Sequence, residues 1–158
     1  NYSITDILCA IGISQLKKLS LFAKRRREIV NRYNQAFNSL DNVKTPFEAS
    51  YCNSNLHLYV LLFDFKEIGI ERAQFMVELK RRGIQTQVHY IPVHVQPFFM
   101  ERFGTKWGDC HNAERYYQKC LSLPLYPAMT DSDIKRVVND VKRIVSSAKR
   151  TTLTASSV

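Results

Sequence analysis

The sequence of 158 residues predicts a mixed α/β fold, in which a small α+β domain follows a long helix. Three observations indicate this class. Apolar residues recur at helical spacing near both ends of the chain. Short runs of β-forming residues lie between them, at 56–65, 84–90 and 121–125. The composition, 45% hydrophobic and 23% charged, is that of a globular chain and excludes a disordered or fibrous one.

The first 42 residues are predicted to form one long helix. Thr5 can cap its N-terminus, and Asp6 places a negative charge in the first turn, where the helix dipole favours it. The helix is expected to end near Asp41, before the loop that begins at Pro46. Its apolar stripe consists of Ile4, Leu8, Ile11, Leu16, Leu19, Phe22, Ile29, Val30, Tyr33, Phe37 and Leu40.

The middle of the chain is predicted to alternate between strands and helices. His57 is expected to take part in the packing of the first strand into a sheet. Residues 84–90 alternate between two faces, and either face can line a site. The predicted elements are a buried strand at 56–65, a helix at 71–82 that ends at Gly83, and a half-buried strand at 84–90.

Two prolines, Pro92 and Pro97, prevent a strand or helix from continuing, so 89–94 is predicted to be an ordered, extended loop. Pro124 confines the next extended piece to the edge of a sheet. The predicted elements after the loop are a helical turn at 98–103, a helix at 112–120 and an edge strand at 121–125.

The last helix has the cleanest helical period in the sequence. Thr130 or Asp131 caps it. Its apolar residues are Ile134, Val137, Val138, Val141, Ile144 and Val145. We therefore expect three parts: a connecting helix at 1–42, a small α+β domain at 43–149 and a disordered tail at 150–158.

Charge and cysteine content bear on partners and compartment. The formal net charge of +9 is consistent with an acidic partner or with a solvated basic surface, and charge alone favours the surface. No run of about 18 apolar residues and no signal peptide occurs, so we expect no membrane segment and a cytoplasmic location. The four cysteines form no C-x-x-C pair and are expected to be reduced thiols.

The common catalytic and metal-binding motifs are not found. The sequence has no Gly-rich phosphate loop, no G-x-S-x-G and no H-E-x-x-H. The spacing of His89, His94, Cys110 and His111 matches no zinc finger, so no metal site is predicted. No cysteine has a recognisable activating environment, which leaves no candidate Cys–His nucleophile.

Four blocks of sequence occur in a specific order: N-Y-S-I-T-D-I-L-C-A-I-G-I-S-Q-L-K-K-L, then H-L-Y-V, then R-R-G-I-Q-T-Q-V-H-Y-I-P-V-H-V-Q-P-F-F, then A-E-R-Y-Y-Q-K-C-L-S-L-P-L-Y-P-A-M-T-D-S-D-I. Together they resemble the C-terminal part of the DegT/DnrJ/EryC1/StrS aminotransferases, from Asn1 to about Lys149. These are pyridoxal-phosphate (PLP) enzymes that aminate keto sugars attached to nucleotides. The block T-Q-V-H-Y-I-P-V-H is most similar to the transaminase of the pseudaminic-acid pathway, which acts on a UDP-linked 4-keto sugar with glutamate as amino donor.

The resemblance implies a fold-type I transferase, normally a homodimer of subunits that each have a large PLP domain and a small C-terminal domain. This chain is similar to the small domain and the connecting helix. The Schiff-base lysine and the groups that hold the PLP ring belong to the other domain, on the same or on a separate chain. Because PLP is the electron sink of the reaction, no catalytic residue is assigned here, and we expect this chain alone not to transaminate.

The resemblance also implies individual site residues. Asn1 matches an asparagine that reaches the cofactor phosphate of the neighbouring subunit, and Tyr2 matches an aromatic residue beside it. The arginine of that motif is Ser3 here, and serine cannot supply the forked, charged donor of arginine. The residues that match the border of the sugar-nucleotide pocket are Gln87, His89 and Tyr90, with His94 just beyond.

Other interpretations remain open at this stage. Either histidine of the loop can have a structural role instead of a substrate-facing one. The chain can be a split-gene product, a truncated fragment or a decayed remnant. It can also be a non-catalytic module whose basic helix binds a polyanion, although no nucleic-acid-binding motif accompanies the basic residues. These are Lys17, Lys18, Lys24, Arg25, Arg26 and Arg27, for which a solvated helix face is the commoner explanation.

Overall fold

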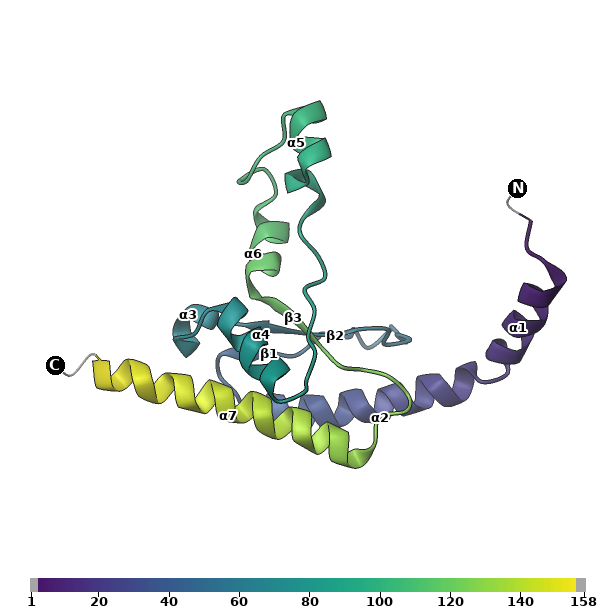
Figure 1. The fold of residues 1–158 in the computed structure, drawn as a ribbon, viewed down its shortest axis with the longest axis horizontal. Coiled ribbons are helices and arrows are strands. Elements are labelled where there is room, and N and C mark those ends of the chain that lie inside the picture. Colours follow the sequence, from purple (N-terminus) through teal and green to yellow (C-terminus); the bar gives the residue numbers. More distant parts are fainter. Residues whose placement is uncertain (1–2, 156–158) are drawn as a thin grey trace.

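A three-stranded antiparallel sheet lies at the centre of the chain (Figure 1). The computed structural model describes the backbone of residues 3–155 and the side chains of residues 3–148. The strands are β1 (Val43–Lys44), β2 (Tyr59–Phe63) and β3 (Cys120–Leu123), in the order β1-β2-β3. Val43 lies opposite Phe63, and Tyr59 lies opposite Leu123. The predicted mixed α/β class is confirmed, and its small sheet is antiparallel.

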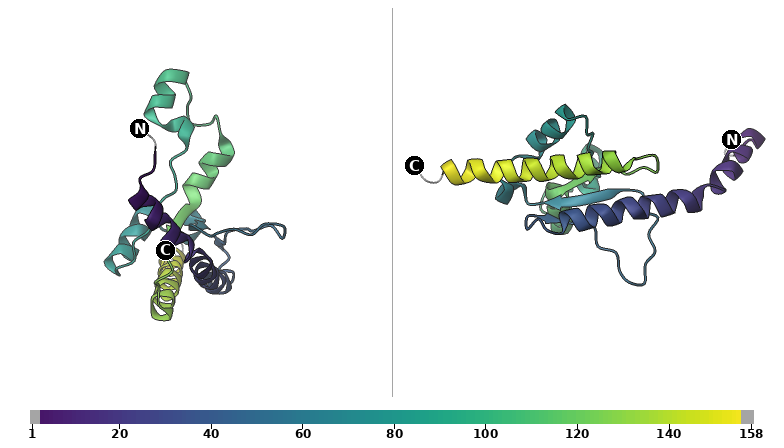
Figure 2. Two further views of the ribbon diagram at one scale, coloured as in Figure 1. Left: turned by 90° about the vertical axis from the view of Figure 1, so that its right-hand side faces the viewer. Right: turned by 90° about the horizontal axis from the view of Figure 1, so that it is seen from below.

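Two long helices, α2 (Leu19–Phe37) and α7 (Asp131–Ala155), run side by side next to the sheet (Figure 2). The shorter helices α3 (Phe65–Ile68) and α4 (Arg72–Arg81) follow β2 and pack against α7. Gly83 follows α4 with a φ of 74°, a left-handed conformation that glycine adopts without strain.

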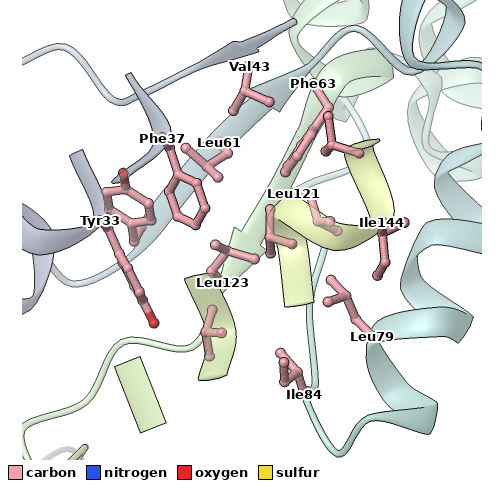
Figure 3. Close-up of a cluster of buried hydrophobic side chains, with 14 of the residues drawn as sticks. Tyr33, Phe37, Val43, Leu61, Phe63, Leu79, Ile84, Leu121, Leu123 and Ile144 are labelled. Atoms are coloured by element: carbon pink, nitrogen blue, oxygen red, sulfur yellow. The ribbon is translucent and has the colours of Figure 1, made fainter. Parts of the chain in front are cut away.

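The core fills the space between the sheet and these helices (Figure 3). Strand β2 shows why the sequence folds this way: Tyr59, Leu61 and Phe63 alternate toward the core and are fully buried. Removing such apolar surface from water is the main favourable term in folding. The helices contribute residues at helical spacing, namely Ile29, Val30, Tyr33 and Phe37 from α2, Phe75 and Leu79 from α4, and Ile134, Val137, Val141, Ile144 and Val145 from α7.

The start of α7 is fixed by a reciprocal cap between Thr130, one of the two predicted caps, and Asp133. The Asp133 backbone N–H donates to Thr130 Oγ1 at 3.1 Å, and the Thr130 N–H donates to Asp133 Oδ2 at 2.9 Å. Arg25 of α2 adds a bond to the same turn, because its Nη2 donates to the carbonyl oxygen of Met129 at 2.7 Å. The pair α2–α7 is therefore joined at this end by polar as well as apolar contacts.

The prediction of one helix over the first 42 residues was wrong. The chain forms α1 (Asp6–Leu16), breaks at Lys17 and Lys18, and continues as α2, which ends at Phe37. The predicted cap is confirmed, since Thr5 Oγ1 accepts from the Leu8 N–H at 3.4 Å. Helix α1 buries no side chain, so the buried apolar stripe of α2 does not continue into α1.

Three further predictions of local structure differ from the fold. Residues 84–90 form no strand, and only Gln87 pairs with the sheet, through a bridge to Ser122. The third strand is instead β1, which was not predicted. His57 is exposed and does not take part in sheet packing. Helix α7 continues past the expected boundary at residue 149 to Ala155, and the rest of the expected tail, 156–158, lies outside the described residues.

An arm extends from the sheet on the side away from α2 and α7 (Figure 1). It consists of the short helix η1 (Val93–Val95), α5 (Pro97–Phe103) and α6 (His111–Lys119), which leads back into β3. Helices α5 and α6 confirm the helical turn and the helix that were predicted here. Over residues 3–155, no helix has both the length and the apolar character that a bilayer span requires.

Candidate functional site

The structure describes four of the six residues that the resemblance assigns to a site. Asn1 and Tyr2 lie outside the described residues. Gln87, His89 and Tyr90 lie in the segment that passes beside β3, and His94 lies in η1, the first element of the arm. This segment therefore connects the sheet to the arm. The roles of all six residues in binding remain predictions.

Ser122 of β3 holds the first two of these residues. Gln87 N–H donates to Ser122 O at 3.2 Å, and Ser122 N–H donates to Gln87 O at 2.8 Å. The side chains continue the contact, because Ser122 Oγ lies 2.7 Å from His89 Nδ1. Ser122 is only 4% exposed, so its side of this contact is shielded from water. One strand residue therefore fixes both the backbone at Gln87 and the ring of His89.

Tyr90 presents its ring to the surface next to His89. It is 70% exposed, and its ring meets the His89 imidazole edge to face, with 4.5 Å between the ring centroids. On the other side of the segment, Gln87 lines a hollow with Met76 and Val77 of α4. Exposed polar and aromatic groups on a held backbone are suited to recognise sugar hydroxyls, a nucleotide base or a diphosphate.

His94 is held by a different partner, Glu114 of α6. His94 Nε2 lies 2.8 Å from Glu114 Oε1, which also accepts from the N–H groups of Gly108, at 2.7 Å, and Cys110, at 3.2 Å. Burial raises the pKa of Glu114, but the hydrogen bonds from His94 and the two backbone groups outweigh it and lower the pKa below the ordinary 4.5. The ionised carboxylate fixes His94 in the arm, so this histidine has a structural partner.

The buried thiol nearest to the site is that of Cys120, at the start of β3. It is fully buried. Burial raises its pKa, and the positive charge of Arg72 only partly offsets this. Cys120 is therefore a protonated packing residue at neutral pH and not an activated nucleophile.

The lysines of the described side chains do not fit a Schiff-base site for PLP. None of them is buried in residues 3–148. The amine of Lys119 is already paired, because its Nζ bonds Oδ2 of Asp64, the carboxylate that caps α3. A PLP lysine must instead lie free in an enclosed pocket, where it can react with the cofactor aldehyde. No catalytic step is assigned to these lysines.

Sequence reasoning missed the two residues that hold the loop, Ser122 and Glu114. A signal existed for Ser122, which is the polar residue inside the apolar run L-S-L-P-L and must find a partner when buried. Glu114 lies in the first turn of a helix, where an acidic residue is common, so its role could not be separated from an ordinary charge on a helix.

Comparison with known proteins assigns the chain to a family. A model of the DegT/DnrJ/EryC1/StrS aminotransferase family matches residues 1–142. The uncharacterized protein MJ1066 of Methanocaldococcus jannaschii is 47% identical over 138 residues, which are 87% of this chain and 36% of that protein. The spore coat polysaccharide biosynthesis protein SpsC of Bacillus subtilis is 43% identical over 134 residues, 84% of this chain and 34% of SpsC. The chain thus spans about a third of the length of these relatives.

Solved structures agree with the sequence match. The aminotransferase TlmJ from Streptoalloteichus hindustanus superposes with a TM-score of 0.81 at 30% identity, over 93% of this chain and 38% of TlmJ. Helicobacter pylori PseC, an aminotransferase involved in the biosynthesis of pseudoaminic acid, superposes with a TM-score of 0.84 at 26% identity, over 93% of this chain and 39% of PseC. The chain therefore belongs to the DegT/DnrJ/EryC1/StrS family of PLP-dependent sugar aminotransferases.

Proposed function

We propose that this chain is the C-terminal part of an aminotransferase that moves an amino group from glutamate to a keto sugar linked to a nucleotide. The proposed pathway is the biosynthesis of a surface polysaccharide or of a sugar of the pseudaminic-acid type. The observation that carries the proposal is the family match over residues 1–142. The similarity to PseC and the polysaccharide role given for SpsC support the class of substrate.

The proposed division of roles between this chain and the PLP domain rests on the family resemblance. PLP, when bound, supplies the electron sink for amino transfer. This chain supplies binding and orientation: the segment from Gln87 to Tyr90 borders the sugar-nucleotide pocket, and Asn1 of one subunit reaches the cofactor phosphate of its dimer partner. The large PLP domain, on the same or on a separate chain, is the required partner, and the cytoplasm is the proposed compartment. By this proposal the 158 residues alone do not transaminate.

The alternative of a basic module for polyanions gains no support from α2. Arg25 forms ion pairs with Glu28 and Asp131, and Arg32 shares Asp131 at 2.8 Å. Arg27 pairs with Glu48 at 3.3 Å. These partners neutralise Arg25, Arg27 and Arg32 within the chain itself.

A chimera tests the proposed function. The matching segment of PseC is replaced by this chain, and amino transfer from glutamate to a UDP-linked 4-keto sugar is assayed. We expect an active enzyme in which His89→Ala raises KM for the nucleotide sugar, whereas His57→Ala, at an exposed histidine outside the site, does not. A chimera that is folded and loaded with PLP but transfers no amino group would contradict the proposal.

The chain alone offers a second test. After incubation with PLP and dialysis, it is expected to keep no visible absorbance from a lysine-bound cofactor, because none of its described lysines is buried. A stable yellow product that borohydride fixes to one defined lysine would show that this chain carries the reactive half of the enzyme.

A further inference from the structure

The contact between Ser122 and His89 restricts how the imidazole can carry its proton. Ser122 Oγ lies 2.7 Å from His89 Nδ1, a normal distance for a hydrogen bond. Within the described part of the chain, the hydroxyl has this ring nitrogen as its one hydrogen-bond partner, and the other ring nitrogen, Nε2, has none. The serine is buried, whereas the histidine is partly exposed, so only the histidine can turn to water.

Two arrangements are compatible with the distance. If Nδ1–H donates to the hydroxyl oxygen, the proton of the buried hydroxyl has no acceptor. An unsatisfied buried donor is costly. If the hydroxyl donates to Nδ1 instead, both groups are satisfied, and the proton of the neutral ring lies on Nε2. The hydrogen-bond network therefore assigns the second arrangement.

We infer that Ser122 is a positioning residue, which holds His89 in the Nε2–H tautomer so that the ring offers an N–H donor to an oxygen atom of the sugar nucleotide. The inference rests on the function proposed above. It deepens that function, because it states which atom of His89 binds and what the substrate supplies, namely a hydroxyl, carbonyl or phosphate oxygen. The backbone pairing of Ser122 with Gln87 fixes the position of the His89 ring along β3.

The tautomer is measured directly on the full chain. Long-range ¹H–¹⁵N spectra of the histidine-labelled protein, in dilute solution at about pH 8 where a free imidazole is neutral, distinguish Nδ1–H from Nε2–H rings. We expect the Nε2–H pattern for His89, with its signals assigned by His89→Gln. Ser122→Ala should give a mixture of the two tautomers, and Ser122→Thr, which keeps the hydroxyl, should retain the native pattern. Ser39→Ala removes a hydroxyl from a distant exposed serine and should change nothing.

The spectrum of the native chain tests the predicted tautomer of His89 even if Ser122→Ala does not fold. An Nδ1–H pattern for His89, or identical His89 signals with and without the Ser122 hydroxyl, would overturn the inference.

The role toward substrate is tested in the PseC chimera. Ser122→Ala is expected to raise KM for the nucleotide sugar about three- to tenfold with little change in kcat, the effect of losing one hydrogen bond made equally in the ground and transition states. Ser122→Thr should restore KM. An unchanged KM in a variant that has lost the tautomer would overturn the substrate half of the inference, while the activity of the chimera would still support the proposed function.

Discussion

The hydroxyl of Tyr33 in α2 donates a hydrogen bond to the carbonyl oxygen of Pro124 at 3.1 Å. This bond joins α2 to the segment that follows β3. Tyr33 is fully buried, and its ring also packs against Phe37 and Tyr59, with 4.9 Å between the centroids of Tyr33 and Tyr59. Burial raises the pKa of the Tyr33 phenol far above its ordinary value, so the group remains a donor across the range in which the protein is folded.

Tyr33→Phe is therefore expected to lower the free energy of unfolding by about 0.5–1.5 kcal/mol, because it removes the donor and leaves the Pro124 carbonyl without it. Urea unfolding followed by circular dichroism measures the change. Tyr51→Phe is the matched control, since Tyr51 is 90% exposed, and it should change the stability by no more than about 0.5 kcal/mol. Equal stability of the native chain and Tyr33→Phe would show that this bond contributes nothing net.

The single carboxylate of Glu114 joins two parts of the arm, namely His94 in η1 and the N–H groups of Gly108 and Cys110 in the loop before α6. Glu114→Ala is expected to leave these donors without an acceptor, so the arm opens more often. Hydrogen exchange of the Gly108 and Cys110 amides should become faster, while amides in β2 keep their protection. Glu114→Gln should give an intermediate result, because its amide oxygen still accepts. The control is Glu101→Ala in α5, which is exposed; amide exchange in Glu114→Ala that matches the native chain would contradict the anchoring role.

Stability is expected to fall in acid as carboxyl groups with lowered pKa values take up protons, among them Asp131 and Glu114. Hydrogen bonds from Arg32 and Arg25 lower the pKa of Asp131 below its ordinary 3.8, and the pKa of Glu114 is lowered below 4.5. In the unfolded chain both groups regain ordinary values and bind protons first. The stabilisation is therefore complete at pH values above those ordinary pKa values and is lost as the pH falls through the lowered ones.

Urea unfolding at a series of pH values measures this dependence. Asp131→Asn should flatten the acid side of the curve, whereas Asp41→Asn, at an exposed carboxyl group, should not. An acid side that Asp131→Asn leaves unaltered would mean that the ion pairs with Arg25 and Arg32 do not hold in solution.

The sequence predicted those elements whose apolar residues face a single core. The period of α7 was confirmed, as were its cap at Thr130 and the strand around Leu61. Residues 84–90 show the limit of this reasoning, since they alternate as a strand does. Strand β3 is only four residues long, and the chain turns away into the arm after a single bridge at Gln87, so no further backbone pairs form. Alternation reports which face is buried, but it does not report whether a neighbouring strand is long enough to pair.

The site was predictable only in part, for a related reason. Family resemblance singled out Gln87, His89 and His94 as residues in one short segment. Their partners lie 20 to 35 positions away in sequence, at separations of 33 for the His89–Ser122 contact and 20 for the His94–Glu114 contact. Such contacts arise from the return of the arm into β3, and no local pattern in the sequence encodes that return. Only the fold shows that His89 contacts Ser122 whereas His94 contacts Glu114.

Helix α1 supplies the last prediction, because its apolar side chains face water. Ile7 is 75% exposed, Ile11 53% and Leu16 68%, and no side chain of α1 is buried. Large apolar side chains exposed in this number promote association. We expect the isolated chain to self-associate as its concentration rises, with a rising mean mass in sedimentation velocity. The double variant Ile7→Lys and Ile11→Lys should remain monomeric over the same range, because charged side chains oppose the contact.

Val77→Lys is the matched control, since Val77 is an exposed apolar residue on α4, and it should associate like the native chain. If the native chain sediments as a monomer at every concentration, the exposed face of α1 does not drive association. If Val77→Lys dissociates the chain as well as the double variant does, the cause is net charge rather than the surface of α1.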